Sequence, residues 1–184
     1  MITQLSGTII SVEDGAAQVR CGDLAYEVLV PAADSMALAA RVGETVTFHT
    51  LHYLEGQGQG SSFWPRLIGF RDARDRSFFE LFTTVKGIGN RKALRALQLP
   101  FGQVASAIAE RDLALLQSLP EIGRRTAEAI CVELKGKVES FATPAAPRTA
   151  ASKGGARGPA TEGARLAAAA HDAVEVLAQL GHPK

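Results

Sequence analysis

Two short clusters of glycine and basic residues carry the residue types in this chain that are best suited to binding an anion. The first cluster runs from Val85 to Ala93, and the second lies 34 positions later, from Leu119 to Ala127. Both contain, in order, an aliphatic residue, Gly, any residue, Arg, any residue and Ala. A glycine turn that opens a helix leaves the first backbone N–H groups of the helix unpaired, and these groups attract a phosphate.

Basic side chains flank both turns, at a place where a helix does not favour them. The helix dipole repels each cation in the first turn by about 0.3–1 kcal/mol, so cations in both copies favour an anionic partner. Backbone amides combined with Arg and Lys bind a phosphate backbone without reading its bases. An ordinary helix–turn–helix corner in a bundle remains the alternative for each copy. The DNA-binding residues predicted from the two clusters are Lys86, Gly87, Ile88, Gly89, Asn90, Arg91, Lys92, Ile122, Gly123, Arg124, Arg125 and Thr126.

Apolar runs on either side of each turn predict that residues 71–141 form an all-α domain of two helix-hairpin-helix units. The runs before the turns are Phe78 to Val85 and Leu113 to Leu119, and those after them are Ala93 to Leu97 and Ala127 to Leu134. The repeat length also suits a helical solenoid, but two copies are fewer than the three that such a stack needs.

Residues 1–70 are expected to form a five-stranded, closed β-barrel of the OB type. One short helix should follow the third strand, capped by Asp34. Residues 54–65 are rich in glycine and predict a protruding hairpin tip, in which Glu55 is the only charged residue. The strands are predicted from partly alternating segments rich in Val, Ile, Thr and aromatic residues, at Leu5 to Val12, Ala17 to Cys21, Leu24 to Pro31, Glu44 to Tyr53 and Arg66 to Phe70.

Composition narrows the possible functions. The formal net charge is only +1, yet residues 1–70 carry −4 and residues 71–140 carry +3. The 2 cysteines are too few for a disulfide framework and are expected to be buried thiols in a reducing cytoplasm. We expect neither a signal peptide nor a membrane span. The sequence contains no phosphate-binding loop for ATP, no nucleophile elbow and no metal-ligand spacing, so we expect no catalytic activity, cofactor or metal.

The end of the chain differs from the rest. Residues 142–163 consist mostly of Ala, Pro, Gly, Thr and Ser and predict a disordered linker. Residues 164–184 predict one helix whose apolar stripe includes Val174, Leu177 and Leu180. A single short helix cannot bury its own apolar face, so this stripe is a candidate partner-binding surface.

Residues 1–141 resemble the RuvA family, the bacterial subunits that bind Holliday junctions during branch migration. The resemblance implies a homotetramer or octamer that holds four-way junction DNA by its phosphates, with Glu55 as an acidic pin that separates strands. It also implies recruitment of the hexameric ATPase RuvB, which binds the ATP, and of the RuvC resolvase. Besides the two hairpins, it is carried by Met1-Ile2, Leu5-x-Gly7-Thr8, Tyr26-Glu27-Val28-x-Val30-Pro31 and Leu67-Ile68-Gly69-Phe70.

The chain also departs from that pattern. Gly56 stands where the family pin has its second acid, and Glu121 replaces the first glycine of the second hairpin. We therefore expect the first hairpin to contribute more to DNA binding. Two other functions stay open: a helix-hairpin-helix DNA glycosylase, which needs an Asp about one helix beyond the hairpin, and a single-strand-binding OB protein. The latter needs exposed barrel aromatics, for which the candidates are Tyr26, Phe48, Tyr53, Phe63, Trp64 and Phe70.

Overall fold

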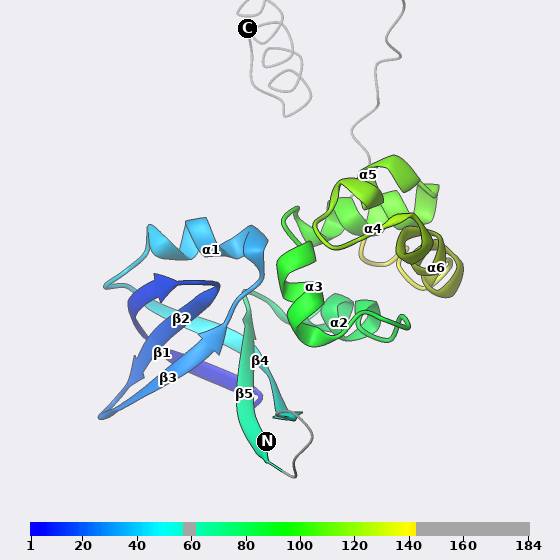
Figure 1. Cartoon of the computed structure of the whole chain (residues 1–184). Coiled ribbons are helices and arrows are strands. Elements are labelled where there is room, and N and C mark those ends of the chain that lie inside the picture. Colours follow the sequence, from blue (N-terminus) through cyan, green and yellow to red (C-terminus); the bar gives the residue numbers. More distant parts are fainter. Residues whose placement is uncertain (57–61, 143–184) are drawn as a thin grey trace, which may run out of the picture. The chain divides into compact units, whose positions relative to one another are not determined.

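The computed structural model describes residues 1–56 and 62–142, which lie in one compact unit that spans Met1–Ala146. Its first part is a closed barrel with the strand order β1-β2-β3-β5-β4, and its second part is a set of helices (Figure 1). The expected fold class, an OB-type barrel followed by helical hairpins, is therefore confirmed. The barrel elements are β1 (Gln4–Glu13), β2 (Ala16–Cys21), β3 (Leu24–Leu29), α1 (Ala32–Ala39), β4 (Thr45–Gly56) and β5 (Phe63–Phe70).

Alternation of apolar and polar side chains explains the barrel. Buried residues of strands β1 to β4 form one core, which includes Ile9, Val19, Val28 and Phe48. Neighbouring strands pair antiparallel, except that β3 and β5 pair in parallel through Val28↔Leu67 and Leu29↔Ile68. Because β4 also pairs with β1, the sheet closes and leaves no open edge.

Five helices follow the barrel within residues 62–142. Four of them form the two hairpins, and α4 links the hairpins; the sequence analysis had named no helix there. Its buried residues, Phe101, Val104, Ala105 and Ile108, nevertheless recur at helical spacing. The helices are α2 (Ala73–Phe82), α3 (Asn90–Ala96), α4 (Phe101–Glu110), α5 (Leu113–Ser118) and α6 (Arg124–Leu134).

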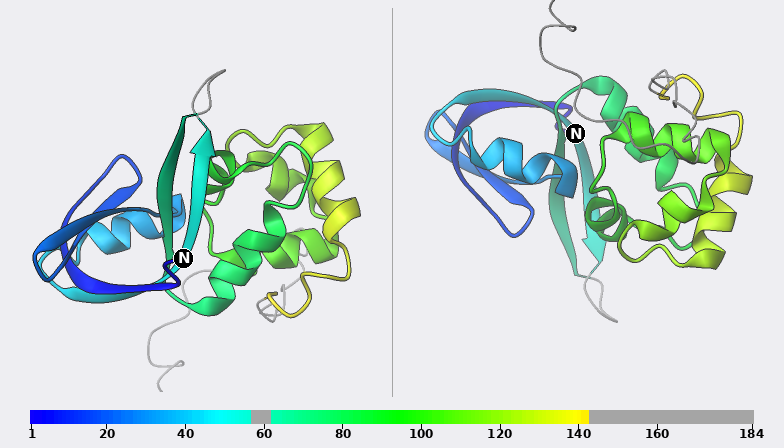
Figure 2. Two further views of the ribbon diagram at one scale, coloured as in Figure 1. Left: turned by 90° about the horizontal axis from the view of Figure 1, so that it is seen from below. Right: turned by 90° about the horizontal axis from the view of Figure 1, so that it is seen from above.

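The barrel and the helices share a hydrophobic core. Ile68 and Phe70, at the end of β5, belong to the core of the helical part. The Phe70 ring lies 5.0 Å from Phe79 and 6.4 Å from Phe101, measured between ring centroids. The Ala33 N–H also donates to the Leu97 carbonyl at 2.9 Å, which joins α1 to the end of α3. Strands β4 and β5 thus form the side of the barrel that faces the helices (Figure 2).

Three local predictions were wrong. Asp34 lies in the first turn of α1 and does not cap it, because Pro31 occupies the N-cap position. The predicted hairpin tip over residues 54–65 is too long, because β4 continues to Gly56 and β5 already begins at Phe63. Glu55 therefore belongs to a strand and not to the tip. Only Cys131 is buried, since Cys21 is half-exposed.

Within residues 1–56 and 62–142, no helix is both long and apolar enough to cross a membrane.

Candidate nucleic-acid interface

The two glycine clusters have the same backbone structure. In the first, the Ile88 N–H donates to Val85 O at 3.0 Å and the Ala93 N–H to Gly89 O at 2.9 Å. The equivalent bonds in the second, Ile122 to Leu119 and Ala127 to Gly123, measure 3.2 and 2.9 Å. A turn thus ends one helix, and a new helix begins after each N-cap glycine. The sequence repeat is therefore a structural repeat.

Both helix starts are open to solvent. Gly89 and Gly123 cap α3 and α6 with extended backbone, at φ −89° and −80°, and neither cap has a side-chain hydrogen bond. A β-carbon built on either glycine would meet no atom within 4 Å. The first intrahelical bond reaches back only from Ala93 or Ala127, so the preceding amides point out of the helix end. These amides are accessible to an anion.

The predicted DNA-binding residues divide into exposed and buried groups. The side chains of Ile88 and Ile122 are only 3% exposed, because they anchor the turns in the helical core. They can therefore contact DNA only through their backbone. Asn90, Lys92 and Thr126 are half-buried, whereas Lys86, Gly87, Gly89, Arg91, Gly123, Arg124 and Arg125 are exposed.

The departure at Glu121 changes the second turn. Gly87 has φ +85°, a left-handed conformation that glycine adopts without strain, and Glu121 takes up the same region with φ +63°. Its carboxylate bonds the Arg95 guanidinium, with 2.5 Å from Nε to Oε1 and 3.2 Å from Nη2 to Oε2. This contact lowers the pKa of Glu121. Arg95 lies one helical turn after Arg91, so the acid of the second hairpin neutralises a basic residue of the first.

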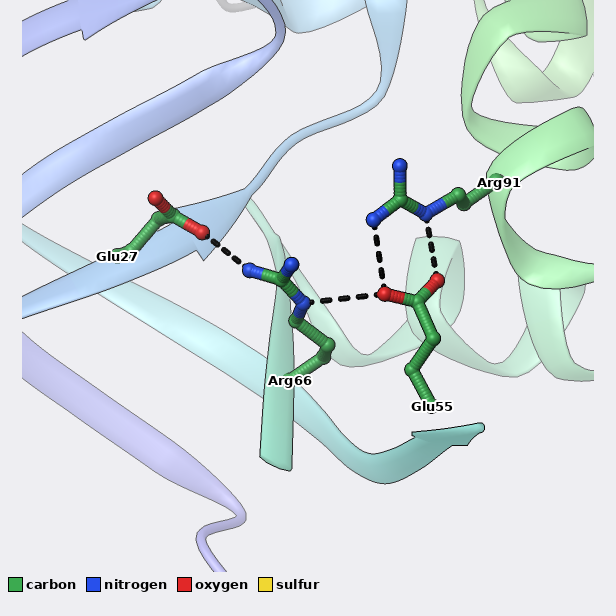
Figure 3. A network of polar contacts seen from close by, with 4 residues as sticks. All are labelled: Glu27, Glu55, Arg66 and Arg91. Atoms are coloured by element: carbon green, nitrogen blue, oxygen red, sulfur yellow. Dashed lines mark hydrogen bonds and ion pairs between the residues drawn. The ribbon is translucent and has the colours of Figure 1, made fainter. Parts of the chain in front are cut away.

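Glu55 is not a free acid at a loop tip. Its Oε1 and Oε2 accept hydrogen bonds from Arg91 Nε at 2.5 Å and Arg91 Nη2 at 2.8 Å (Figure 3). Arg66 Nε also donates to Oε2 at 3.1 Å, and Arg66 Nη1 donates to Glu27 at 2.6 Å. The Glu55 side chain is only 16% exposed. The predicted pin and a predicted phosphate-binding arginine thus bind each other.

The electrostatics of this network follow from its hydrogen bonds. Bonds from Arg91 hold the pKa of Glu55 below its ordinary value, with Arg66 adding to the effect, although burial opposes it. Glu55 in turn raises the pKa of Arg91. The neighbouring Tyr53 hydroxyl is buried and has no hydrogen-bond partner in the part of the chain that the structure describes. Burial, followed by the charge of Glu55, raises the pKa of Tyr53.

A cleft of about 650 Å³ lies beside the network. Strands β2 and β3, the start of α1, helix α3 and the turn before α6 contribute to its wall. Its charged residues are of both signs and include Glu27, Arg66, Arg91, Arg95 and Glu121.

A second, acidic pocket lies between α1 and α2 and contains Asp34, Asp72 and Asp75. Burial, with repulsion from Asp72 and Asp34, raises the pKa of Asp75 to about 6. Among the residues that the structure describes, no group of three or more His, Cys, Asp or Glu residues is arranged to hold a metal ion. The acidic pocket is therefore not assigned a ligand.

Comparison with known proteins assigns the chain to a family. Residues 1–59 match the model described as RuvA N terminal domain, and residues 79–137 match the SAM-like Helix-hairpin-helix tandem. The chain is 38% identical over 142 residues to the Holliday junction branch migration complex subunit RuvA of Rhodopirellula baltica, covering 77% of this chain and 69% of the relative. It is 35% identical over 182 residues to the protein of that name from Deinococcus radiodurans, covering 98% and 83%. The chain belongs to the RuvA family.

Membership of the RuvA family supports the main interpretation of the sequence, and it gives no support to a DNA glycosylase or a general single-strand-binding protein. It also directs attention to residues that the sequence analysis missed. Arg66 bonds the predicted site residue Glu55, and Arg95 bonds Glu121, which replaces the first glycine of the second hairpin. Spacing could have revealed Arg95, four residues after Arg91 on one helix face. Arg66 could be placed only once the β4–β5 register was known.

Two predictions about the end of the chain lie outside the described residues. These are the linker over residues 142–163, of which only Ala142 is described, and the helix over residues 164–184 with its stripe of Val174, Leu177 and Leu180.

Proposed function

We propose that this chain binds four-way DNA junctions through their sugar-phosphate backbones, as the DNA-binding subunit of a branch migration complex. Family membership supports this function, because the relatives are named as RuvA subunits of a Holliday junction branch migration complex. The observation that carries the proposal is the repeated hairpin. Two open helix starts, each with exposed basic side chains, have the same hydrogen bonds at a fixed offset and are anchored in one hydrophobic core. This arrangement suits two phosphates and no particular base.

The partners proposed with this function follow the family. The ATP-hydrolysing motor is a RuvB hexamer, so this chain acts without a cofactor of its own. Four or eight copies of the chain assemble on one junction, so that each arm meets equivalent hairpins, and the RuvC resolvase is a further partner. The C-terminal stripe of Val174, Leu177 and Leu180 is the proposed contact with RuvB. Such a complex would act in recombination and repair of DNA in the cytoplasm.

Glu55 is proposed to act near the point where strands exchange, where its charge would repel a phosphate backbone. Its bond to Arg91 supports a two-state version of this role. Without DNA, the Glu55 carboxylate accepts the hydrogen bonds of the Arg91 guanidinium that a phosphate would otherwise accept. When a DNA phosphate takes that place, the acid is released beside the bound strand.

The proposal is tested by a gel-shift comparison of a four-way junction with a linear duplex of the same length and sequence. We expect clear preference for the junction, and equal affinity would reject the proposal. Repeating the titration between about 50 and 200 mM salt should give a fall of about 0.9 log unit in affinity per log unit of salt for each phosphate neutralised. A response independent of salt would contradict phosphate binding.

Paired substitutions separate the two hairpins. Arg91→Ala with Lys92→Ala should weaken junction binding by about tenfold or more, because charge-assisted hydrogen bonds to phosphate are lost. Arg124→Ala with Arg125→Ala should have a smaller effect, because two acids near the second hairpin would repel a phosphate there: Glu121, at the position of the first glycine, and Glu128, which bonds Arg124 at 3.0 Å. The reverse order would show that the acids near the second hairpin do not weaken it.

A matched control removes two positive charges from the barrel. Arg20→Ala with Arg41→Ala changes the net charge by the same amount as either hairpin pair, at positions on the barrel and not in the hairpins. We expect junction affinity to change by less than about twofold, because only long-range attraction is altered at moderate salt. An equal loss in the control would mean that total charge, and not the hairpins, determines binding.

A further inference from the structure

Large apolar side chains are exposed on the outermost rungs of the β4–β5 hairpin. Leu54, Phe63 and Trp64 are 64%, 62% and 54% exposed. The register of the two strands pairs Glu55 with Trp64, Leu54 with Pro65 and Gly56 with Phe63. Residues directly opposite one another on antiparallel strands point to the same face of the sheet. Trp64 therefore shares a face with Glu55, whereas Phe63 points to the other face.

The face of the hairpin that carries Trp64 changes from buried and apolar to charged and exposed along the strands. On this face the pair Leu51 and Ile68 packs in the helical core, and the next pair outward, Tyr53 and Arg66, lies in the charged network. Trp64 occupies the outermost of these rungs, next to Glu55, whose carboxylate bonds Arg91 of the first hairpin. An exposed indole thus lies one side chain away from a guanidinium that is proposed to bind phosphate.

We infer that Trp64 is a stacking platform for an unpaired nucleobase of the DNA that the first hairpin holds. This inference rests on the proposed function and adds a second kind of contact to it. An aromatic plane beside a cationic group is the composition of sites for single-stranded nucleic acid, in which the cation holds the backbone and the ring stacks on a base. A junction supplies such a base wherever strands separate at its centre. Stacking tolerates any base, in keeping with binding that does not depend on sequence.

The surroundings of Trp64 favour DNA over a protein partner. The centre of a protein–protein interface is depleted of charged residues. On this face of the hairpin, however, the indole is flanked by Glu55 and Arg66, and Arg91 lies beyond them. A ligand that combines a flat apolar base with an anionic backbone matches this arrangement of an exposed ring and a basic network.

The experiment uses the intrinsic fluorescence of the full chain, because Trp64 is the 1 tryptophan of the sequence. Three DNAs are titrated, with binding followed in parallel by gel shift: an intact four-way junction, the same junction with abasic sites at the crossover nucleotides, and a linear duplex. We expect the intact junction to quench Trp64 emission, and the abasic junction to bind with much weaker quenching. Trp64→Leu should weaken binding to the intact junction by about fivefold or more.

Two variants provide controls. Trp64→Phe keeps an aromatic plane and should bind the intact junction within about twofold of the parent chain, whereas Phe63→Leu removes a ring of similar exposure from the opposite face and should leave affinity unchanged. An intact junction that binds without quenching, or that binds Trp64→Leu as tightly as the parent, would overturn the inference and leave the proposed function intact. Absence of junction binding would refute both the stacking inference and the proposed function. Emission that changes with protein concentration alone would place a second copy of the chain on the indole and also overturn the inference.

Discussion

Neutralising Glu55 should tighten junction binding by releasing Arg91. In the free protein, Glu55 makes a two-point contact with Arg91, at 2.5 and 2.8 Å. Exposed ion pairs contribute about 0.2–1 kcal/mol, and we take the upper end because Glu55 is only 16% exposed and the contact is bidentate. A DNA phosphate must displace this contact. About 1 kcal/mol corresponds to about a fivefold change in Kd, and a Gln retains a neutral hydrogen bond, so we expect Glu55→Gln to lower Kd by about threefold.

The assay is a double-mutant cycle on junction affinity. Kd is measured for the parent chain, Glu55→Gln, Arg91→Ala and the double variant, at about 0.15 M salt, where the Debye length of about 8 Å limits long-range repulsion. In the Arg91→Ala background we expect Glu55→Gln to have little effect, because no ion pair remains to be broken. We expect Arg66 to keep its bond to Glu27 in every variant, because neither partner is changed, so the hairpin should stay folded.

Two results would refute this reasoning. An equal gain in affinity from Glu55→Gln with and without Arg91 would mean that the acid acts only by general repulsion of DNA. A loss of affinity would mean that Glu55 orders the binding site and does not compete for it. In the second case, thermal denaturation of Glu55→Gln would also show a lower Tm than the parent chain.

Three further substitutions test other contacts. Glu121→Gly should raise the Tm and tighten junction binding, since it removes a left-handed non-glycine residue and frees Arg95; weaker binding would show that Glu121 positions Arg95. Ile122→Ala should lower the free energy of unfolding by about 3 kcal/mol, because a 3% exposed anchor is truncated; denaturant titration measures this. Asp75→Asn should stabilise the fold by about 1 kcal/mol at pH 7.5, after allowance for solvent exposure, and by less at pH 5. The raised pKa of about 6 means that folded Asp75 holds a proton that the unfolded chain has already lost, so its contribution to stability falls as the pH rises from about 4 to 6; a pH-independent difference in Tm would contradict this.

Local sequence rules were sufficient for the hairpins. The order of aliphatic residue, glycine and arginine encodes where each helix starts, and a buried Ile88 or Ile122 fixes each turn in the core. These are contacts between residues close together in sequence, and the register of each turn depends on little else. The strands of the barrel were likewise predictable from alternation, although not their ends.

Long-range contacts could not be predicted in the same way. Glu55 and Arg91 are 36 positions apart, and only the packing of the barrel against the helices brings them together. The last residues of β4, Leu54 to Gly56, were not predicted as strand because they adjoin a glycine-rich run. Glycine has a low strand propensity, even at a position where pairing with the neighbouring strand holds the backbone extended. Asp34 was wrongly placed at a helix cap because the preceding Pro31 can begin α1 a turn earlier.

The shared core at Phe70 also bears on how mechanical work would pass through the protein. Since β5 ends among Phe79 and Phe101, the barrel cannot swivel freely against the hairpins. If DNA is held at Gly89 and Gly123 as proposed, any pull that a motor exerts on it would reach the β4–β5 hairpin through this shared core. Trp64 and Glu55 would then move together with the two hairpins.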